Sequence, residues 1–306
     1  MELIPEQYRQ HLLECHGQAE AQAWMERLPD VLASCARRWQ LTLLPPFPNL
    51  SFHYATPAIR ADGTHVVVRV AAPTGEFEYE AEAMRVFDGQ GTARLLECDQ
   101  KLEVMLLERL EPGMTLAELV PEQDERATSI LTATMRKLWR PAPAQHNFPT
   151  VAEWFQGFAR LRERYNGGCG PLPQRLVEEA ETLVKDLLAS SGPPMLLHGD
   201  LHHENVLLSG DEWRAIDAKG VVGDPGYETG LLFYNPIPKL FHLPDQHKIL
   251  ARRLDQLAEE LSMDRQRIRG WGLAQCMLSC WWSMEDGSEE PPLDVLACAE
   301  IVSTLE

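Results

Sequence analysis

The first third of the chain shows two successive patterns of apolar positions. Residues 5–40 carry apolar side chains at helical spacing and are followed by a proline-rich loop. From Leu50 to Val70 the pattern becomes typical of strands, with Asp62-Gly63 as a hairpin turn. It next predicts one helix and two strands, over Glu76–Phe87, Ala93–Cys98 and Leu102–Leu107. These elements indicate a small lobe of mixed helix and strand.

Helical periodicity dominates the remainder of the chain. The segment Glu108–Gly113 has the composition of a hinge. Beyond it the periodicity predicts six helices, over Thr115–Val120, Asp124–Leu138, Val151–Tyr165, Pro173–Ser190, Asp245–Leu261 and Asp264–Met284. We therefore predict an α+β fold of two lobes, residues 1–111 and 112–306, of which the second is the larger and mainly helical.

A polar loop separates two apolar runs in the larger lobe. The runs, Met195–Leu197 and Val206–Leu208, are typical of short buried strands. A hairpin turn over Ser209–Glu212 leads into a third strand, which ends at Ile216. Folding this strand back would bring the next residue, Asp217, alongside the polar loop.

The polar loop holds Asp200 and Asn205, and together with Asp217 they stand at intervals found in kinases. An Asp that accepts a hydroxyl proton must stand beside an Asn and a second Asp that hold Mg²⁺ against ATP phosphates. Hard oxygen ligands of this kind suit Mg²⁺. Each residue alone could be an ordinary turn residue that hydrogen-bonds local backbone. The joint spacing favours phosphoryl transfer.

The charge balance narrows the range of partners. The chain has 28 Lys and Arg against 46 Asp and Glu, a net charge of −18 over 306 residues. This excess argues against nucleic acid and anionic membrane as partners; it would favour a cationic substrate, or it could serve solubility alone. No apolar run approaches the roughly 20 residues that span a bilayer, and no signal-peptide pattern opens the chain. We therefore expect a cytoplasmic protein.

The seven cysteines form no regular framework, so we expect reduced thiols rather than disulfides. Cys276 and Cys280 could share one helix face and supply half of a metal site. No Cys or His pair stands at matching spacing elsewhere, which favours two packed core thiols. We predict no zinc site.

Four stretches of the sequence carry a resemblance to a known family. They are Ala61-Asp62-Gly63-Thr64, Leu106-Leu107-Glu108-Arg109-Leu110, His198-Gly199-Asp200-Leu201-His202 with Asn205, and the segment from Ile216 to Tyr227. In these stretches the chain resembles the aminoglycoside phosphotransferases, and is most similar to the streptomycin 6-kinase type that is grouped with hydroxyurea resistance kinases. The resemblance covers nearly the whole chain. It implies a protein-kinase-like fold whose small lobe binds nucleotide and whose helical lobe carries catalysis and binds the acceptor.

The resemblance also implies roles for single residues. Asp200 is expected to be the catalytic base, and Asn205 and Asp217 are expected to bind Mg²⁺. Adenine is expected to contact the backbone of Glu108, Arg109 and Leu110, and support of the catalytic loop is expected from His198, Lys219 and Asp224. Lys219 could instead contact the transferring phosphoryl group.

Acceptor specificity is expected from the carboxyl-terminal part of the helical lobe. Trp282, Glu285 and Asp286 could line a pocket whose carboxylates bind ammonium or guanidinium groups, with the adjacent Trp281 in the core. For the nearby Glu289 and Glu290, the alternative is an acidic, solvated helix end that runs into Pro291-Pro292.

The chain departs from the family pattern in the nucleotide lobe. The usual Lys of the third strand is replaced by Arg69, for which Glu80 is the best partner and Glu78 the second choice. Arg can fork onto phosphate oxygens but places its donors differently from Lys; alternatively, Arg69 lies on an exposed strand face. The nucleotide-covering loop, Asn49–Tyr54, lacks the repeated glycines that let backbone amides approach phosphate. Glu228 stands where the family usually has Asp, and could still brace the catalytic loop.

The leading hypothesis is a phosphotransferase that uses ATP and Mg²⁺ to phosphorylate a hydroxyl of a small cationic molecule. The family resemblance implies an aminoglycoside of the streptomycin type as this acceptor. The enzyme is expected to be a monomer or homodimer. Two alternatives stay open: a housekeeping kinase for an amino alcohol, homoserine or sugar, and a nucleotide-binding pseudokinase with weak turnover. Acceptor-dependent ADP release that requires Asp200 would exclude the pseudokinase.

Overall fold

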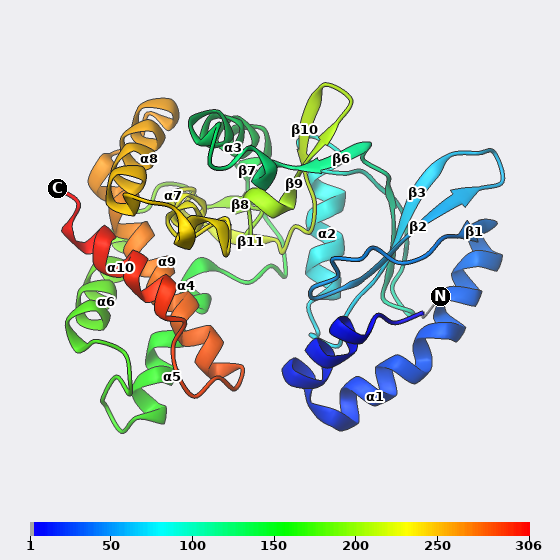
Figure 1. Ribbon diagram of the computed structural model, residues 1–306, viewed down its shortest axis with the longest axis horizontal. Helices are drawn as coiled ribbons and strands as arrows, with labels where there is room; N and C mark the ends of the chain where they lie inside the picture. Colours follow the sequence, from blue (N-terminus) through cyan, green and yellow to red (C-terminus); the bar gives the residue numbers. More distant parts are fainter. Residues whose placement is uncertain (1–2) are drawn as a thin grey trace. The chain divides into compact units, whose positions relative to one another are not determined.

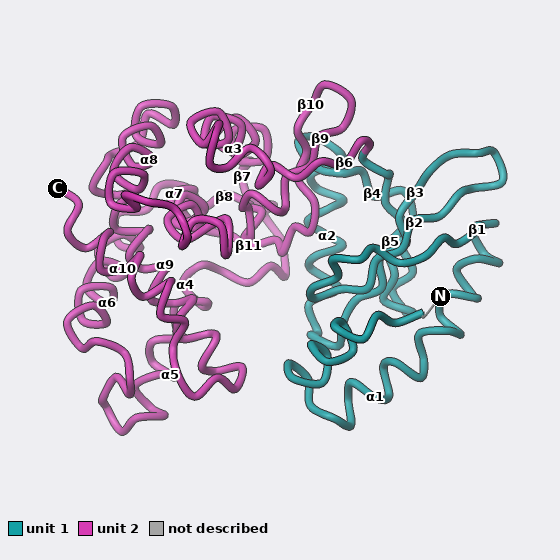
Figure 2. The backbone as a smooth tube through the Cα atoms, in the orientation of Figure 1, with its two compact units in different colours: residues 1–110 teal, residues 111–306 magenta. Residues whose placement is uncertain are grey.

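The computed structural model describes residues 3–306, and the chain divides into two compact units, residues 1–110 and 111–306 (Figures 1 and 2). Each unit has its own sheet or sheets and its own helices. Among the described residues, no helix combines the length and the apolar character that crossing a bilayer requires.

Unit 1 is built on an antiparallel sheet of five strands in the order β1-β2-β3-β5-β4. The strands are β1 (Leu41–Leu43), β2 (Tyr54–Arg60), β3 (His65–Val70), β4 (Leu95–Asp99) and β5 (Val104–Glu108). At the β2–β3 turn the Asp62 carboxylate accepts a hydrogen bond from the Thr64 N–H at 2.9 Å, and Gly63 has a φ of 87°. The predicted hairpin is therefore confirmed, whereas β1 was not predicted.

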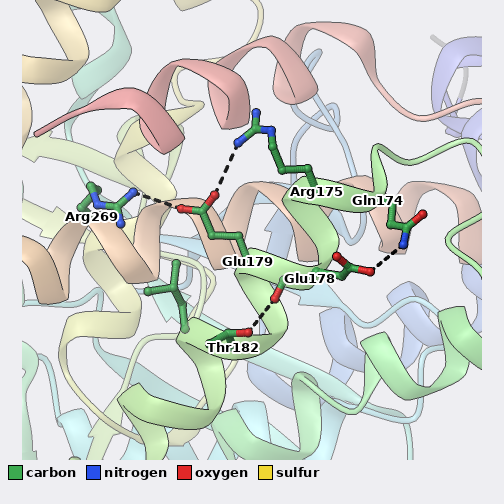
Figure 3. A pocket seen from close by; sticks show the side chains of 7 residues that line it. Gln174, Arg175, Glu178, Glu179, Thr182 and Arg269 are labelled. Carbon is green, nitrogen blue, oxygen red and sulfur yellow. Dashed lines mark hydrogen bonds and ion pairs between the residues drawn. The ribbon is translucent and has the colours of Figure 1, made fainter.

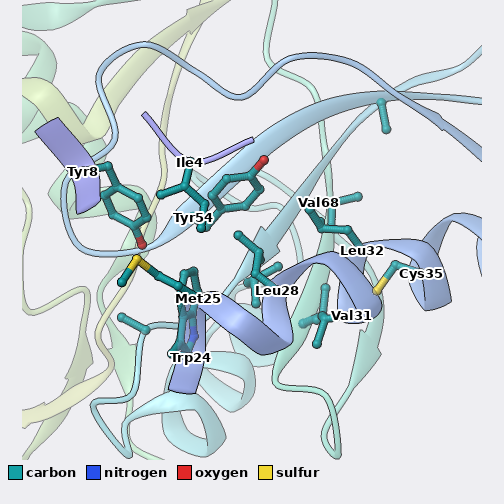
Figure 4. Close-up of a cluster of buried hydrophobic side chains, with 14 of the residues drawn as sticks. Ile4, Tyr8, Trp24, Met25, Leu28, Val31, Leu32, Cys35, Tyr54 and Val68 are labelled. Carbon is teal, nitrogen blue, oxygen red and sulfur yellow. The ribbon is translucent and has the colours of Figure 1, made fainter. Parts of the chain in front are cut away.

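Two helices complete unit 1, α1 (Glu6–Trp39) and α2 (Phe77–Phe87). The buried face of α1 packs on the sheet, with Trp24, Leu28 and Leu32 against Tyr54 and Val68 (Figure 4). Burying a side chain of this size stabilises the fold by about 1.5–3 kcal/mol. Both helices were predicted, although α1 is interrupted at Gly17, whose φ of 74° is not helical.

Hydrogen bonds also attach α1 to the loops around the sheet. Trp24 Nε1 donates to the carbonyl of Ala71 at 2.7 Å, just beyond the end of β3. The Tyr8 hydroxyl donates to the carbonyl of Phe52 at 3.1 Å, just before β2. The long amino-terminal helix therefore fixes the backbone on both sides of the sheet's central hairpin.

Unit 2 is mainly helical, as predicted. Its longer helices are α3 (Asp124–Leu138), α5 (Gly157–Arg164), α6 (Gln174–Ala189), α8 (Gln246–Leu261), α9 (Arg265–Glu285) and α10 (Leu293–Thr304). Its single-turn helices are α4 (Val151–Trp154), α7 (Gly226–Thr229) and the 3₁₀ turns η1 (Leu116–Leu119), η2 (His203–Asn205), η3 (Gly230–Phe233) and η4 (Lys239–His242).

Two small antiparallel sheets carry the polar loop of unit 2. One has the order β10-β9-β6 and the other the order β11-β8-β7. Their strands are β6 (Pro112–Thr115), β7 (Arg140–Pro141), β8 (Met195–Leu197), β9 (Val206–Ser209), β10 (Glu212–Ala215) and β11 (Val221–Gly223). The predicted strands on both sides of the polar loop are confirmed, and so is the turn between β9 and β10. The very short strands β6, β7 and β11 were not predicted.

The prediction of one helix over Val151–Tyr165 is wrong, because the chain forms α4 and α5 with a break at Phe155 and Gln156. The break brings Gly157 so close to α9 that a Cβ there would lie 2.9 Å from Leu278 Cδ1. Phe155 and Phe158 are both buried, so the apolar spacing continues through the break and hides it from a periodicity argument. The predicted helix at Thr115–Val120 is the 3₁₀ turn η1, and α10 was missed.

A buried ion pair joins α3 to α8. The Arg253 side chain is fully buried, with Nη2 2.5 Å from Oδ1 of Asp124 and Nε 3.1 Å from its Oδ2. Arg253 Nη1 also donates to the carbonyls of Leu232 and Asn235. A buried guanidinium needs this complete set of acceptors, because an unpaired charge in the interior is costly.

Candidate active site

The loop between β8 and β9 carries Asp200, and glycine is required immediately before it. Gly199 has a φ of 89°, a left-handed conformation that glycine adopts without a steric penalty. A Cβ at this position would lie 2.9 Å from Cη2 of Trp154 and 3.2 Å from Cβ of Lys219. The backbone therefore enters the loop at very close range to both neighbours.

His198 ties the loop to the segment that holds Asp217. Its Nδ1 accepts a hydrogen bond from the Asp200 N–H at 3.2 Å, so Nε2 carries the proton and donates to the Ile216 carbonyl at 2.8 Å. The His198 carbonyl accepts from the N–H groups of Lys219 and Gly220 at 2.8 and 3.0 Å. Burial is the largest influence on the ring and lowers the pKa of His198 to about 4, which keeps it neutral at pH 7. These are the contacts expected of a loop-bracing residue.

Asp200, Asn205 and Asp217 lie on hydrogen-bonded segments. Asn205 Nδ2 donates to the Asp200 carbonyl at 2.9 Å and to Asp200 Oδ2 at 3.1 Å. The Ile216 N–H donates to the Asn205 carbonyl at 2.9 Å, and Asp217 follows with a φ of 62°. Asp is among the few residues with a side chain that adopt this conformation with some frequency. The structure therefore brings together the three polar residues that the sequence spacing singled out.

The surroundings of Asp200 favour its ionised form. Packing around the carboxylate would raise its pKa, but His202, His198 and Lys219 outweigh that effect and hold the pKa of Asp200 below its usual value. His202 Nε2 lies 3.6 Å from Asp200 Oδ2, and the Asp200 side chain keeps 38% of its surface exposed. Asp200 is thus an accessible carboxylate at neutral pH.

Glu228 holds the start of the same loop with both carboxylate oxygens. Oε1 accepts from the Gly199 N–H at 2.9 Å, and Oε2 accepts from Trp139 Nε1 at 2.6 Å. The side chain is fully buried on α7. Burial is the largest influence and raises the pKa of Glu228 to about 7, against the hydrogen bonds that lower it. Glu228 therefore braces the β8–β9 loop, although it lies 29 residues after Gly199 in the sequence.

The raised pKa of Glu228 makes a pH-dependent contribution to stability. Because the folded state holds this proton more tightly than the unfolded chain, the contribution is fully present below pH 4.5 and is lost as the pH rises to about 7. We expect the free energy of unfolding of the native protein to fall by about 3 kcal/mol relative to that of Glu228→Gln as the pH rises through this window. Urea unfolding of both proteins from pH 4 to 8 measures it. A constant difference would mean that Glu228 titrates with its ordinary pKa.

Two further residues predicted to support the loop have different partners. Asp224 Oδ1 accepts from the Gly226 N–H at 2.7 Å, and Oδ2 forms an ion pair with Arg267 of α9. Asp224 therefore fixes the turn that leads into α7 and so places Glu228. Lys219 contributes its backbone N–H to the His198 carbonyl and its charge to the environment of Asp200.

In unit 1, Arg69 and Glu80 form a buried ion pair between β3 and α2. Arg69 Nη2 lies 2.8 Å from Glu80 Oε2, with 6% and 1% of the two side chains exposed. The alternative of Arg69 on an exposed strand face is therefore wrong, and Glu78, which is exposed, is not the buried partner. His53 adds a third member, since its Nε2 lies 3.3 Å from Glu80 Oε1.

The predicted adenine segment follows β5. Glu108 Oε1 accepts from the Arg94 N–H at 2.8 Å, and the Glu108 N–H donates to the Arg94 carbonyl at 3.0 Å. The Arg109 guanidinium stacks 4.6 Å from the centroid of the Phe47 ring, and Leu110 is buried. The side chains of this segment are thus engaged within unit 1.

The predicted acceptor residues lie at the end of α9. Trp281 is buried and Trp282 partly exposed, as expected for neighbours on a helix. The Trp282 ring packs edge-on against Trp154 at 5.9 Å. Glu285 forms an ion pair with Arg160, at 2.5 Å between Oε1 and Nε. An acceptor cation would therefore compete with Arg160 for Glu285, while Asp286 is exposed at the helix end.

A pocket of about 680 Å³ lies elsewhere in unit 2, on α6 and α9 (Figure 3). Glu179, Arg175 and Arg269 line it, and Glu179 forms ion pairs with both arginines, with Nη1 of Arg269 3.3 Å from Glu179 Oε1. None of the predicted site residues contributes to its lining. Three of its charged side chains are engaged in these ion pairs and Glu178 accepts a hydrogen bond from Gln174, so we assign the pocket no role in catalysis.

Sequence reasoning left out Trp139, Arg267 and His53 from the site. Each reaches its partner across a long interval of sequence, so no local spacing reveals it. The available signal for His53 was its place in the nucleotide-covering loop. Trp139 and Arg267 carried none.

Comparison with known proteins identifies the family. The family model described as aminoglycoside/hydroxyurea antibiotic resistance kinase matches residues 53–287. Streptomycin 6-kinase of Streptomyces griseus is 30% identical over 289 residues, covering 94% of this chain and 93% of that protein. Hydroxyurea phosphotransferase of Kitasatospora aureofaciens is 32% identical over 289 residues, covering 94% of this chain and 82% of that protein.

Solved structures share the fold at low sequence identity. Aminoglycoside phosphotransferase APH(4)-Ia superposes with a TM-score of 0.61 at 17% identity, covering 90% of this chain and 98% of that one. A choline/ethanolamine kinase family protein of Mesorhizobium loti superposes with a TM-score of 0.65 at 18% identity, covering 92% and 94%. These matches confirm the predicted protein-kinase-like fold. The chain is a phosphotransferase that belongs to the aminoglycoside/hydroxyurea antibiotic resistance kinase family.

Proposed function

We propose that the protein transfers the terminal phosphoryl group of ATP to a hydroxyl of a small cationic molecule of the streptomycin type. The observation that carries the proposal is the linked set of Asp200, Asn205 and Asp217 in a chain of this family. Two related proteins at about 30% identity are named streptomycin 6-kinase. APH(4)-Ia has been solved with AMP-PNP and hygromycin B, which supports ATP as donor and an aminoglycoside as acceptor.

Asp200 is assigned as the general base. Its carboxylate is ionised and partly exposed, so it can orient an acceptor hydroxyl and take its proton as the phosphoryl group is transferred. Glu228 accepts from the Gly199 N–H and His198 accepts from the Asp200 N–H, so the peptide groups on both sides of Gly199 are held. The rigid loop thus positions the base before substrate binds, which avoids an ordering cost during the reaction.

Asn205 and Asp217 are assigned as the ligands of Mg²⁺. The Asn205 amide nitrogen faces Asp200, so its Oδ1 lies on the opposite side of the amide group. An amide oxygen and a carboxylate suit Mg²⁺, which commonly takes one or two protein ligands and completes its shell with phosphate oxygens and water. When bound, the ion neutralises the charge of the phosphates.

Arg69 is assigned to the ATP phosphates, in place of the usual Lys. We expect Arg69→Ala to raise the KM for ATP by more than about tenfold, because a charge-assisted contact to phosphate is lost. Steady-state kinetics with varied ATP measure it, and Arg60→Ala, at the last residue of β2, where Arg60 pairs with Glu97, is the matched control. An unchanged KM with a folded variant would remove Arg69 from the nucleotide site.

Hydroxyurea is a second candidate acceptor. The hydroxyurea phosphotransferase of Kitasatospora aureofaciens is 32% identical, no less similar than the streptomycin 6-kinases at 30%. The net charge of −18 favours the cationic aminoglycoside, since long-range attraction raises the encounter rate of opposite charges. The buried Arg69–Glu80 pair and the intact catalytic loop argue against a pseudokinase.

The test is product analysis after incubation with ATP and Mg²⁺. Streptomycin, other aminoglycosides, hydroxyurea and choline are offered separately, and phosphorus NMR identifies any new phosphate ester. We expect the ester only with streptomycin-like acceptors. An ester formed only with hydroxyurea or choline would move the protein to that substrate class.

A further inference from the structure

A polar residue of the loop before β2 completes the Arg69–Glu80 pair. His53 is 5% exposed, and its Nδ1 accepts a hydrogen bond from the Ala72 N–H at 3.1 Å. A ring nitrogen that accepts from a backbone N–H carries no proton, so His53 is neutral with its proton on Nε2. Nε2 lies 3.3 Å from Glu80 Oε1 and can donate to it. His53 thus links the backbone beyond β3 to the carboxylate of α2.

Glu80 divides its two oxygens between two donors. Oε2 lies 2.8 Å from Arg69 Nη2, and Oε1 faces His53 Nε2. With both oxygens held, the plane of the carboxylate is fixed in the buried site. A guanidinium is planar and its donors form a rigid fork, so the plane of Glu80 sets the direction of the other Arg69 donors. An ammonium group rotates freely about its stem and would depend less on this constraint.

We propose that His53 is a positioning residue for nucleotide binding, which holds Glu80 and, through it, the Arg69 guanidinium in the orientation that receives ATP phosphates. The proposal rests on the proposed function, in which Arg69 binds those phosphates. It also gives the glycine-poor loop Asn49–Tyr54 a part in the site through a side chain rather than through backbone amides.

The loop is built to hold His53 in place. The carbonyl of the preceding residue, Phe52, accepts a hydrogen bond from the Tyr8 hydroxyl at 3.1 Å. Ala72, which binds His53 Nδ1, follows Ala71, whose carbonyl accepts from Trp24 Nε1 at 2.7 Å. Both attachments come from α1, so the amino-terminal helix fixes the two backbone segments between which the imidazole lies.

Two substitutions separate the contacts of the imidazole. In His53→Asn, the side-chain oxygen can replace Nδ1 and accept from Ala72, but the side chain is too short to reach Glu80. In His53→Gln, the amide nitrogen can replace Nε2 and donate to Glu80, while the contact with Ala72 is lost. Calorimetric titration with ATP and Mg²⁺ measures the dissociation constant, and melting temperatures confirm that the variants are folded.

We expect His53→Asn to raise the dissociation constant for ATP about tenfold, as for the loss of one hydrogen bond to a charged group. His53→Gln is expected to stay within about twofold of the native protein. The exposed His65→Asn, at the start of β3, is the control. Equal affinities for His53→Asn and the native protein would overturn the proposal, and so would an equal loss in the Asn and Gln variants, because that indicates a general structural role.

A double-mutant cycle with Glu80→Ala, which removes both carboxylate oxygens, tests whether His53 acts through Glu80. If it does, His53→Asn has no further effect on ATP affinity in the Glu80→Ala background. Additive losses would contradict it. A native protein that binds no ATP would instead refute the proposed function, so the two failures are distinguishable.

Discussion

Replacing Asp200 by Asn is expected to lower kcat by at least about a hundredfold, with the KM for ATP little changed. The amide has nearly the same shape and can still accept the hydrogen bond from Asn205, but it cannot take a proton from the acceptor hydroxyl. Because the change leaves the ligands assigned to Mg²⁺ in place, the loss should appear in turnover and not in nucleotide affinity. Initial rates at saturating acceptor and varied ATP measure both constants.

The control for this experiment is Asp211→Asn, the same substitution in the exposed β9–β10 turn. It should leave kcat unchanged within experimental error. If Asp200→Asn kept more than about a tenth of the native kcat, Asp200 could not be the general base.

Replacing Asp124 by Ala is expected to destabilise the protein by about 3–5 kcal/mol. Arg253 is fully buried, and Asp124 supplies the only carboxylate in its ion pair among the described residues. The substitution leaves the guanidinium with its carbonyl acceptors but no countercharge. Urea unfolding followed by circular dichroism measures the loss.

Two further variants show whether the buried charge is the cause. The double variant Asp124→Leu with Arg253→Met removes the carboxylate and the fully buried guanidinium and leaves only the partly exposed Arg252, which also pairs with Asp124, so it should recover most of the lost stability. Asp255→Ala breaks the surface ion pair between Asp255 of α8 and Arg265 of α9 and should cost less than about 1 kcal/mol. A loss in Asp124→Ala no larger than in Asp255→Ala would contradict this account of the pair.

The predictable part of the site is local in sequence. Asp200, Asn205 and Asp217 belong to a strand, a loop and a hairpin that follow one another, so spacing alone predicts that they meet. The Arg69–Glu80 pair follows in the same way from a strand and the helix after it. Helix α3 was predicted with its observed bounds because its apolar stripe is regular.

The unpredicted part depends on contacts between distant segments. Trp139, just after α3, meets Glu228 of α7, and Arg267 of α9 meets Asp224 just before α7; periodicity carries no information on such long-range contacts. The break between α4 and α5 also arises from tertiary packing, at the close approach of Gly157 to α9. Strand β7 has only two residues, and β6 begins with Pro112-Gly113, a pair typical of turns, so neither shows a strand pattern.

The nucleotide lobe has Arg69 where the family usually has Lys. Arg69 keeps the charge and the buried Glu80 partner, but its fork must be oriented, and His53 supplies a contact that can do so. We therefore interpret the departure from the family pattern as a local exchange of one phosphate contact for another. It does not indicate loss of the nucleotide site.

The most direct test of the central claim is ADP release by the purified protein with ATP and streptomycin, measured with Mg²⁺ and with the metal chelated. The account predicts release that requires the acceptor, Mg²⁺ and Asp200, with Asp211→Asn behaving as the native protein. ADP release that continues without any acceptor, or that survives in Asp200→Asn, would contradict phosphoryl transfer to an acceptor hydroxyl by this site.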